Sequence, residues 1–302
     1  MTAYRFCRTD DIGLLVEALN RCWLPYFPGE PPMTPAAFKR SIRDLQVWCS
    51  NCMVALAGSD PVGVLIGAKR AAGTLVYRLA VHPDHRRQGH GRHLLSSLGS
   101  KLAILGPRRI VAEVPETLAP ACELFEASGY TQEARLTDYV FRGNGSGPPA
   151  EGNGGEDGGA LVIPVTVNDL AVNGLLQEAE PVCWQRSVHT LTAGHTDISG
   201  LAVASDERIE AGLLYMTDGM AANANVAEDT TAQAADVEIL WLRSFVDDGG
   251  ARLARLLSHL AARGLGSARL SKVHPAEFPR GLLETLGLRP TIHHRLYAAS
   301  AQ

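Results

Sequence analysis

The residues best suited to chemistry lie in one segment, LAVHPDHRRQGHGRHLL, residues 79–95. A predicted strand ends at Pro83, a short basic loop follows, and Gly89 and Gly91 open an amphipathic helix. The first turn of a helix has backbone N–H groups without intrahelical partners and the positive end of the helix dipole. Glycine has no Cβ, so a bulky anion can approach this backbone closely. The pattern predicts a phosphate-binding loop; a glycine-containing turn with solvated arginines is the alternative.

Two motifs of the first half, at the expected spacing, resemble those of the GNAT-type N-acetyltransferase superfamily. The first is V-x-P followed by R-x-x-G-x-G, which here runs from Val81 to Gly91. The second is ACELFEASGY at 121–130, which is similar to the family's A-x-x-L-Y-x-x-x-G-F. The resemblance covers about residues 3–142. It implies acetyl-CoA or another acyl-CoA as the ligand and co-substrate, with no metal.

The resemblance also implies roles for individual residues. The amides from Arg87 to Arg92 hold the pyrophosphate, and a bulged strand around Leu79–Val81 pairs with the pantetheine arm. One strand amide polarises the thioester carbonyl, a contact worth about 3–4 kcal/mol in oxyanion holes. Phe125 stands where the family often has a tyrosine general acid, so that proton donor is missing. The cofactor-binding residues implied are Leu79, Ala80, Val81, Arg86, Arg87, Gln88, Gly89, His90, Gly91, Arg92 and Phe125.

Transfer to an amine requires a base, or a water relay, that removes the ammonium proton. Glu113, near the end of a predicted strand, and Tyr77, on the strand before the motif, are the catalytic candidates. A solvated strand-end acid and a half-buried structural tyrosine are their alternatives. His82 and His85 sit on the phosphate side, where they shape the loop or contact coenzyme A.

The six cysteines are spread through a long chain, which favours reduced thiols and a cytoplasmic location over a disulfide framework. Cys122 allows a covalent thiol route, against the simpler reading of a small buried cysteine. Cys49 and Cys52 form a lone C-x-x-C inside a strand pattern, which is a weak signal for a metal.

The length of 302 residues predicts two domains. Residues 143–160 contain eight glycines and no large apolar side chain, so they predict a flexible linker between domains at 1–142 and 161–302. RTDDI at 8–12 and LFEASGY at 124–130 both recur 158 positions later, as TVNDL and LLETLGL. This shared offset, which also relates Tyr139 to Tyr297, predicts a duplicated unit. Residues 217–236 read as a loop of the second copy only.

The pattern of the first half predicts an α/β fold in which helices flank a mixed central sheet. Thr34 is a predicted N-cap before Pro35. The segment up to Phe141 reads as a terminal hairpin. Strands are predicted at 4–8, 47–56, 62–70, 74–82 and 108–114, and helices from 12, at 35–45, 89–105 and 119–127.

The second half keeps this order but lacks the basic loop. It has SFVDDGGARLARLL at 244–257, where Asp247 and Asp248 would repel a pyrophosphate. We therefore expect a degenerate GNAT-like domain, an architecture similar to that of tandem GNAT enzymes such as mycothiol synthase-like proteins. Glu238 stands where some relatives keep a catalytic base; an ordinary exposed acid is the alternative.

A net charge of −4 argues against a nucleic-acid partner, and no run of 18 apolar residues or signal-like start predicts a membrane contact. The sequence therefore predicts a cytoplasmic N-acetyltransferase that moves acetyl from acetyl-CoA directly to a small-molecule or peptide amine in a ternary complex. A weakly catalytic or non-catalytic acyl-CoA-binding regulatory module is the alternative. An acyltransferase for longer chains or another acceptor is a third reading.

Overall fold

The computed structural model describes residues 2–142, 160–177, 181–194, 198–217, 237–263 and 267–301. The chain divides into two compact units. Residues 2–135 and 294–301 belong to the first unit, and the described residues between 136 and 293 belong to the second. The predicted linker at 143–160 and the predicted loop at 217–236 lie outside the described residues, apart from Ala160 and Thr217.

The first half follows the predicted order of elements closely. The second helix begins as expected, because the Thr34 hydroxyl accepts a hydrogen bond from the Ala37 amide at 3.1 Å and Pro35 occupies the first turn. The strands are β1 Thr2–Phe6, β2 Met53–Ala57, β3 Asp60–Arg70, β4 Gly73–Val81, β5 Arg109–Pro115 and β6 Thr131–Arg142. The helices are α1 Ile12–Cys22, α2 Pro35–Leu45, α3 His90–Leu105 and α4 Ala119–Ala127, with 3-10 turns at Thr9–Asp11, Leu24–Tyr26, Cys49–Asn51 and Pro83–His85.

The second half repeats this order with shorter helices. Its strands are β7 Leu161–Val165, β8 Ser199–Ala204, β9 Ile209–Thr217, β10 Val237–Ser244, β11 Ser267–Val273 and β12 Leu288–Ser300. Its helices are α5 Val167–Val172, α6 Val188–Ala193, α7 Ala251–Ala262 and α8 Leu282–Thr285, with a 3-10 turn at Trp184–Arg186. The predicted strand near 236–243 and the predicted leucine-rich helix after 250 correspond to β10 and α7.

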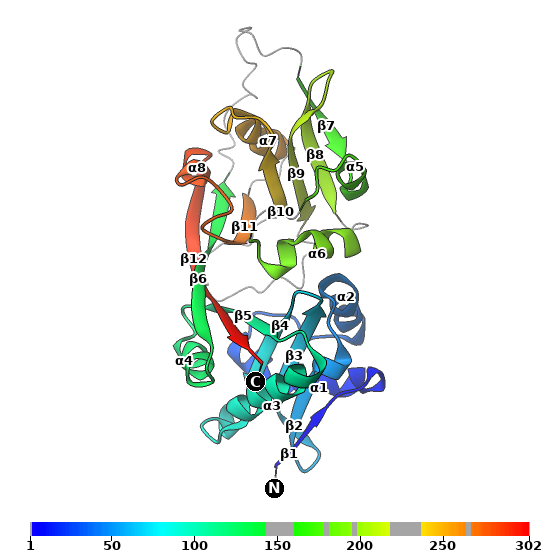
Figure 1. Cartoon of the computed structure of the whole chain (residues 1–302), viewed down its shortest axis with the longest axis vertical. Helices are drawn as coiled ribbons and strands as arrows, with labels where there is room; N and C mark the ends of the chain where they lie inside the picture. The colour runs from blue at the N-terminus through cyan, green and yellow to red at the C-terminus, as the bar shows by residue number, and fades with distance from the viewer. Residues whose placement is uncertain are drawn as a thin grey trace. The chain divides into compact units, whose positions relative to one another are not determined.

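The two halves exchange their final strands (Figure 1). In the first unit the strand order is β1-β2-β3-β4-β5-β12, and in the second it is β7-β8-β9-β10-β11-β6. β12 pairs antiparallel with β5 from His294–Pro115 to Ser300–Arg109. β6 pairs antiparallel with β11, whereas β4–β5 and β10–β11 are parallel. The mixed, helix-flanked sheet that the sequence predicts is confirmed, and each half supplies the strand that completes the other unit.

The core of the first unit shows how the exchanged strand is held. Leu94, Leu98 and Leu102 of α3 are fully buried in a cluster that includes residues of β2 to β5 and α4. Tyr297 of β12 is fully buried in the same cluster. Its ring stacks on Phe125 of α4 with centroids 5.8 Å apart. A residue near the end of the second half is therefore a core residue of the first unit.

Two predicted elements of the first half are wrong. Residues 47–56 are not one strand, because Cys49–Asn51 form a 3-10 turn closed by a hydrogen bond from the Cys52 amide to the Cys49 carbonyl at 2.9 Å. Only Met53–Ala57 pair as a strand. The predicted terminal hairpin is also absent, because Thr131–Arg142 forms one continuous strand. That strand lies partly in each unit, with residues up to Arg135 in the first and residues from Leu136 in the second.

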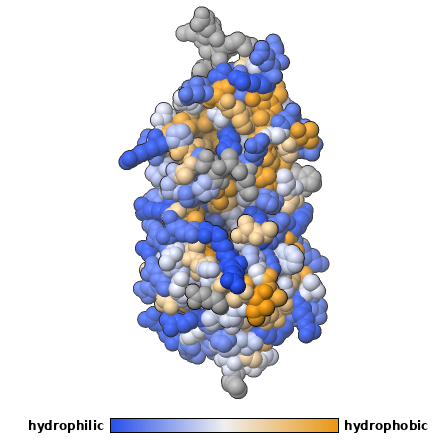
Figure 2. Space-filling view, in the orientation of Figure 1, coloured by the Kyte–Doolittle hydropathy of each residue, from blue (hydrophilic) through white to orange (hydrophobic). Residues whose placement is uncertain are grey.

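The surface does not single out a site. Hydrophilic and hydrophobic residues are interspersed over the face seen in Figure 2. The large apolar side chains that stand exposed in the described segments are Trp48, Ile104, Leu105, Leu161 and Val172. Within those segments, no helix has the length and hydropathy that crossing a membrane requires.

Candidate functional site

The predicted phosphate loop has the backbone geometry of an anion cradle. After β4, the 3-10 turn Pro83–His85 leads into Arg87 with φ 61° and Gly89 with φ 83°, both in the left-handed region. Gly89 is the N-cap of α3, and the amide of His93 makes the first hydrogen bond back to it, at 3.0 Å. The amides from Arg87 to Arg92 have no acceptor among the described residues. Alternating left-handed residues before a helix orient such amides toward an anion.

A cavity of about 630 Å³ opens beside this loop. It lies wholly in the first unit, between the loop, the end of β4, α4 and the segment after α1. The predicted cofactor residues that line it are Leu79, Ala80, Val81, Arg86, Arg87, Gly89, His90, Gly91 and Arg92. Gln88 and Phe125, the other two predicted residues, are not part of its lining.

The edge of β4 next to the cavity is open. β4 and β5 pair only at Thr74–Ile110 and Leu75–Val111, so β4 has no strand partner on this side beyond that point. Open strand edges bind extended ligands through backbone hydrogen bonds. The bulge lies earlier than predicted: Arg78 faces Ile66 and Val76 faces Gly67, which leaves Tyr77 as the extra residue. The space beside Leu79–Val81 therefore arises because β4 and β5 separate after Leu75, and not from a bulge at Leu79–Val81.

An aromatic wall that the sequence analysis missed closes one side of the cavity. Trp23, Tyr26 and Phe27 line it, and the rings of Trp23 and Phe27 stack with centroids 4.4 Å apart. The Tyr26 hydroxyl donates to the Val81 carbonyl at 2.6 Å and accepts from the Arg86 Nε. Arg86 lies over the Tyr26 ring, 4.3 Å from its centroid. Arg86 therefore ties the wall to the loop. Three aromatic residues just after the amphipathic pattern of α1 are the signal that could have revealed it.

Behind this wall lies a buried ion pair with unsatisfied atoms. The side chains of Glu30 and Arg78 are 10% and 5% exposed, and their charged atoms lie 3.4 Å apart. Trp23 donates its indole N–H to Glu30 Oε2 at 3.1 Å. Glu30 Oε1 and Arg78 Nε have no hydrogen-bond partner within the part of the chain that is described. Buried polar atoms are normally satisfied, so this pair has capacity for a further polar group.

The catalytic residues that the sequence proposed are not brought to the cavity. Tyr77 is buried in β4, 5.4 Å from the Arg78 guanidinium measured to the ring centroid. Glu113 of β5 lies opposite Leu296 of β12. Neither residue lines the cavity. Of the flanking histidines, His85 lines it, whereas His82 accepts a hydrogen bond from the Asp84 amide at 3.3 Å.

The cysteine side chains lie in the interior. All six are buried and free of disulfides. Cys122 approaches the Pro115 carbonyl with its sulfur at 3.8 Å. Burial raises the pKa of the Cys49 and Cys52 thiols above the usual range, which disfavours the thiolate that metal binding or redox chemistry needs. The described residues contain no cluster of three or more histidine, cysteine or acidic side chains that could hold a metal ion.

His90, the first residue of α3, connects the cradle to β1. Its Nδ1 lies 2.6 Å from the Tyr4 hydroxyl, and its Nε2 is buried without a partner in the described segments. Burial lowers the pKa of His90 below 6.5, and the nearby His85 and His93 lower it further. This shift favours the neutral imidazole.

This shift predicts a pH dependence of stability. Because the folded pKa of His90 lies below the unfolded value of 6.5, the unfolded chain takes up the proton more readily. The free energy of unfolding should therefore fall as pH drops below about 6.5 and level off below the folded pKa. Urea melts at neutral and acidic pH should show a smaller acid loss for His90→Gln than for the wild type. If the wild type and His90→Gln lost the same unfolding free energy in acid, His90 would not be the source of the pH dependence.

The position where the resemblance implies a tyrosine general acid holds Phe125, which lies outside the cavity lining. Phe125 is buried, packs edge-on against Tyr130 with centroids 5.1 Å apart, and stacks on Tyr297. The Tyr297 hydroxyl donates to Glu126 Oε1 at 2.7 Å and accepts from Arg295 Nη1 at 3.2 Å. Burial and the bond to Glu126 raise the pKa of Tyr297 to about 12. This hydroxyl does not line the cavity.

In the second unit, β10 is the counterpart of β4 and carries Glu238. This side chain lies in the interior, and not on the surface. Its carboxylate accepts from Arg269 Nε at 2.8 Å, and the residue is 6% exposed. Burial raises the pKa of Glu238 although Arg269 opposes the shift. The residue does not line the cavity found in this unit.

Comparison with known proteins agrees with this geometry. Residues 48–132 match the family model described as an acetyltransferase (GNAT) domain. The structure of a tandem GNAT protein from the clavulanic acid biosynthesis pathway is similar with a TM-score of 0.67, at 15% identity, over 100% of this chain and 99% of that one.

Two further structures are similar over the whole length. A GCN5-related N-acetyltransferase from Sphaerobacter thermophilus has a TM-score of 0.64 at 15% identity, covering 100% of this chain and 96% of its own. An acetyltransferase-like protein from Pyrococcus horikoshii has a TM-score of 0.60 at 14% identity, covering 100% and 90%. Residues 48–132 thus match a GNAT acetyltransferase domain, and the chain as a whole has the fold of tandem GNAT proteins.

Proposed function

We propose that the first unit binds acetyl-CoA and transfers its acetyl group directly to a primary amine. The observation that carries this proposal is the set of unpaired amides from Arg87 to Arg92 beside a 630 Å³ cavity. Amides at a helix N-terminus, with the positive end of the helix dipole, suit a pyrophosphate. Arg87 and Arg92 add positive charge to the same cavity.

The open edge of β4 positions the reacting group. The pantetheine arm extends beside Leu79–Val81, where β4 lacks a strand partner. An amide of this edge hydrogen-bonds the thioester oxygen and stabilises the charge that develops when nitrogen attacks the carbonyl carbon. The carbon–sulfur bond then breaks and coenzyme A leaves as the thiolate. The acylated nitrogen releases its remaining extra proton to solvent, which gives the neutral amide. Phe125 has no hydroxyl to protonate that sulfur, so solvent does.

The amine approaches past the aromatic wall. Trp23 and Phe27 offer ring faces that attract an alkylammonium group, and the buried Glu30 lies directly behind Trp23. Glu30 Oε1 is buried without a partner among the described residues, so it accepts the ammonium proton through an intervening water to give the neutral nucleophile. Glu30, Glu113 and Tyr77 all lie outside the cavity lining, and we favour Glu30 because its hydrogen-bond partner Trp23 lines the cavity.

Thiol release from acetyl-CoA in the presence of aliphatic, aromatic, amino-acid and peptide amines tests the function. We expect release that depends on one amine class and tracks formation of the amide. Coenzyme A binding without turnover across the panel would instead support the regulatory acyl-CoA-binding module, which the missing hydroxyl at Phe125 favours. A series of acyl-chain lengths tests the third reading, an acyltransferase for longer chains.

The role of Glu30 has its own test. Glu30→Gln keeps an acceptor for the Trp23 indole but cannot take up a proton. We expect kcat/KM for the amine to fall about 100-fold, the usual loss of a general base, with the KM for acetyl-CoA unchanged. Glu17→Gln, on the exposed side of α1, is the matched control. Full activity in the Glu30 variant would exclude it as the base.

A further inference from the structure

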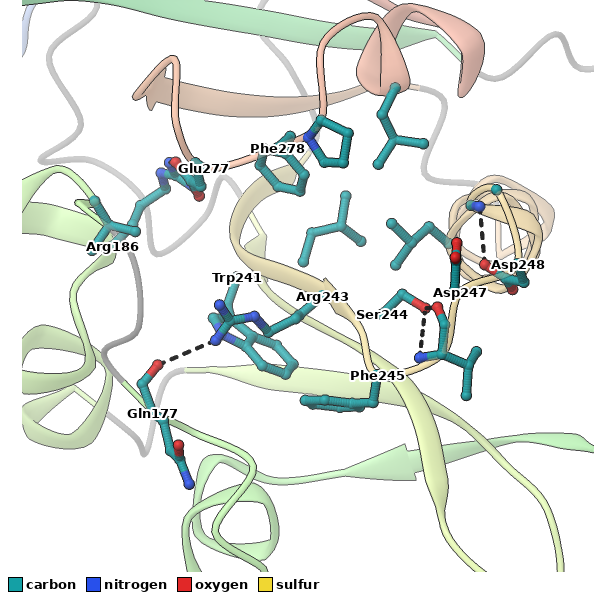
Figure 3. A pocket seen from close by; sticks show the side chains of 18 of the residues that line it. Gln177, Arg186, Trp241, Arg243, Ser244, Phe245, Asp247, Asp248, Glu277 and Phe278 are labelled. Atoms are coloured by element: carbon teal, nitrogen blue, oxygen red, sulfur yellow. Dashed lines mark hydrogen bonds and ion pairs between the residues drawn. The ribbon is translucent and has the colours of Figure 1, made fainter.

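The second unit contains a cavity of its own, of about 570 Å³ (Figure 3). It lies at the end of β10, between the loop 245–250, the start of α7 and the segment before α8. This is the same place in the repeat that the cradle holds in the first unit. Gly250 is the N-cap of α7 with φ 92°, as Gly89 is of α3 with φ 83°. The repeat has therefore kept a cavity and a left-handed glycine at this helix start.

Here the helix start is already occupied by the protein. The Asp248 carboxylate accepts hydrogen bonds from the amides of Gly250 at 2.9 Å and Arg252 at 2.8 Å. It also lies 3.1 Å from the Arg252 guanidinium, which Glu210 binds from the other side. Burial raises the pKa of Asp248, but these hydrogen bonds outweigh burial and hold it below its usual value. A phosphate would meet a fixed negative charge instead of free amides.

The walls of this cavity are largely aromatic and aliphatic. Trp241, Phe245 and Phe278 line it, and Figure 3 shows their rings around the space. Trp241 and Phe245 are tilted by 43° with centroids 6.0 Å apart. The Trp241 ring rests on the Cα of Gly212, where an added Cβ would stand only 2.6 Å from the ring. The main wall is thus fixed in place by the strand behind it.

The charges around the walls leave one carboxylate without an ion pair. Arg186 and Glu277 line the cavity and bind each other, with side chains 2% and 10% exposed. Arg243 donates to the Gln177 carbonyl at 3.4 Å. Asp247 is exposed at the cavity and forms no ion pair or hydrogen bond with any described residue. Together the lining carries three carboxylates and two guanidinium groups.

We propose that this cavity binds an organic ammonium ion with an aromatic or aliphatic body, at a site separate from the acyl-CoA cavity. The body packs between Trp241, Phe245 and Phe278, and the ammonium group faces Asp247. Aromatic faces and a carboxylate both attract such a cation. Asp248 occupies the amides at the start of α7, so a nucleotide phosphate cannot bind them.

The intact chain, labelled with fluorotryptophan, tests this site by fluorine NMR. The Trp241 resonance is assigned with Trp241→Phe, and coenzyme A is added at saturation. We expect phenethylammonium chloride to shift the Trp241 resonance saturably, and phenethyl alcohol to bind at least about tenfold more weakly because it lacks the charge. Coenzyme A alone should leave this resonance unmoved. An unmoved resonance with phenethylammonium, or equal binding of the alcohol, would overturn the proposal.

A substitution locates the charge. Asp247→Asn should weaken phenethylammonium binding about tenfold, as loss of one facing charge does at a partly exposed site. Asp206→Asn removes another exposed carboxylate of the same unit, in the turn between β8 and β9, and should leave the affinity unchanged. Thermal melts confirm that both variants fold. Equal affinities for the two variants would overturn the assignment of Asp247. The outcome does not depend on turnover, so it stands apart from the function proposed for the first unit.

Discussion

Gly89→Glu is expected to weaken coenzyme A binding by at least about 100-fold, a loss of about 2.7 kcal/mol. Gly89 has φ 83° and is the N-cap of α3. A residue with a Cβ is strained there by about 1–2 kcal/mol. The new carboxylate would also compete with the pyrophosphate for the amides, as Asp248 does at the start of α7 in the second unit. Isothermal titration of the intact chain with coenzyme A measures the effect.

Two further variants separate the causes. Gly89→Ala adds the strain without the charge, and no atom lies within 4 Å of the added Cβ, so it should lose less affinity than the glutamate. Gly99→Glu adds the same charge in the interior of α3, again with open space around the Cβ. That control should bind coenzyme A normally. Wild-type affinity in Gly89→Glu would show that the pyrophosphate does not sit at this helix start.

Tyr297→Ala should unfold the first unit preferentially, at a cost of about 3–5 kcal/mol. Tyr297 is fully buried in that core, although it belongs to the second half of the sequence. Tyr297→Phe keeps the ring and loses the hydroxyl's partly exposed bonds to Glu126 and Arg295, so about 1 kcal/mol is expected. Hydrogen exchange should speed up in β5, the strand beside β12, while the strands of the second unit stay protected.

The repeat offers a matched control for this result. Tyr139 occupies the same position in β6, packs against the core of the second unit and donates to Glu284 at 3.3 Å. Tyr139→Ala should raise exchange in β11 and leave β5 protected. If either variant raised hydrogen exchange equally in β5 and β11, the two units would not have separate cores. The prediction that each tyrosine stabilises one unit would then be wrong.

Local signals in the sequence predicted most elements and most of the cradle. The Thr34 cap, Pro83 after β4 and the glycine at the start of α3 each act on neighbouring residues, and each lies where it was expected. Turn chemistry within 47–52 was missed because its apolar residues also fit a strand. The Tyr77 bulge and the splay between β4 and β5 depend on partner strands, which a linear pattern does not specify.

The exchange of β6 and β12 between the two units could not be predicted from the sequence for a related reason. β6 and β12 hold corresponding places in the two repeats, and a sequence pattern does not specify which sheet each strand joins. The offset that relates Tyr139 to Tyr297 reveals the duplication but not which sheet each tyrosine joins. Likewise, the spacing of Trp23 and Glu30 does not reveal that both contact Arg78, because Arg78 comes from a strand that is distant in the sequence.

The strand exchange also governs how this chain can be made. A ribosome must translate β7 to β11 before residues 294–300 can dock beside β5, so the first sheet stays unfinished while most of the second half is being synthesised. A nascent chain that stops early carries an uncovered strand edge, which is prone to aggregation and proteolysis. The first sheet is therefore completed only after β12 has been made, and separately expressed halves would each need the other's terminal strand to complete their sheets.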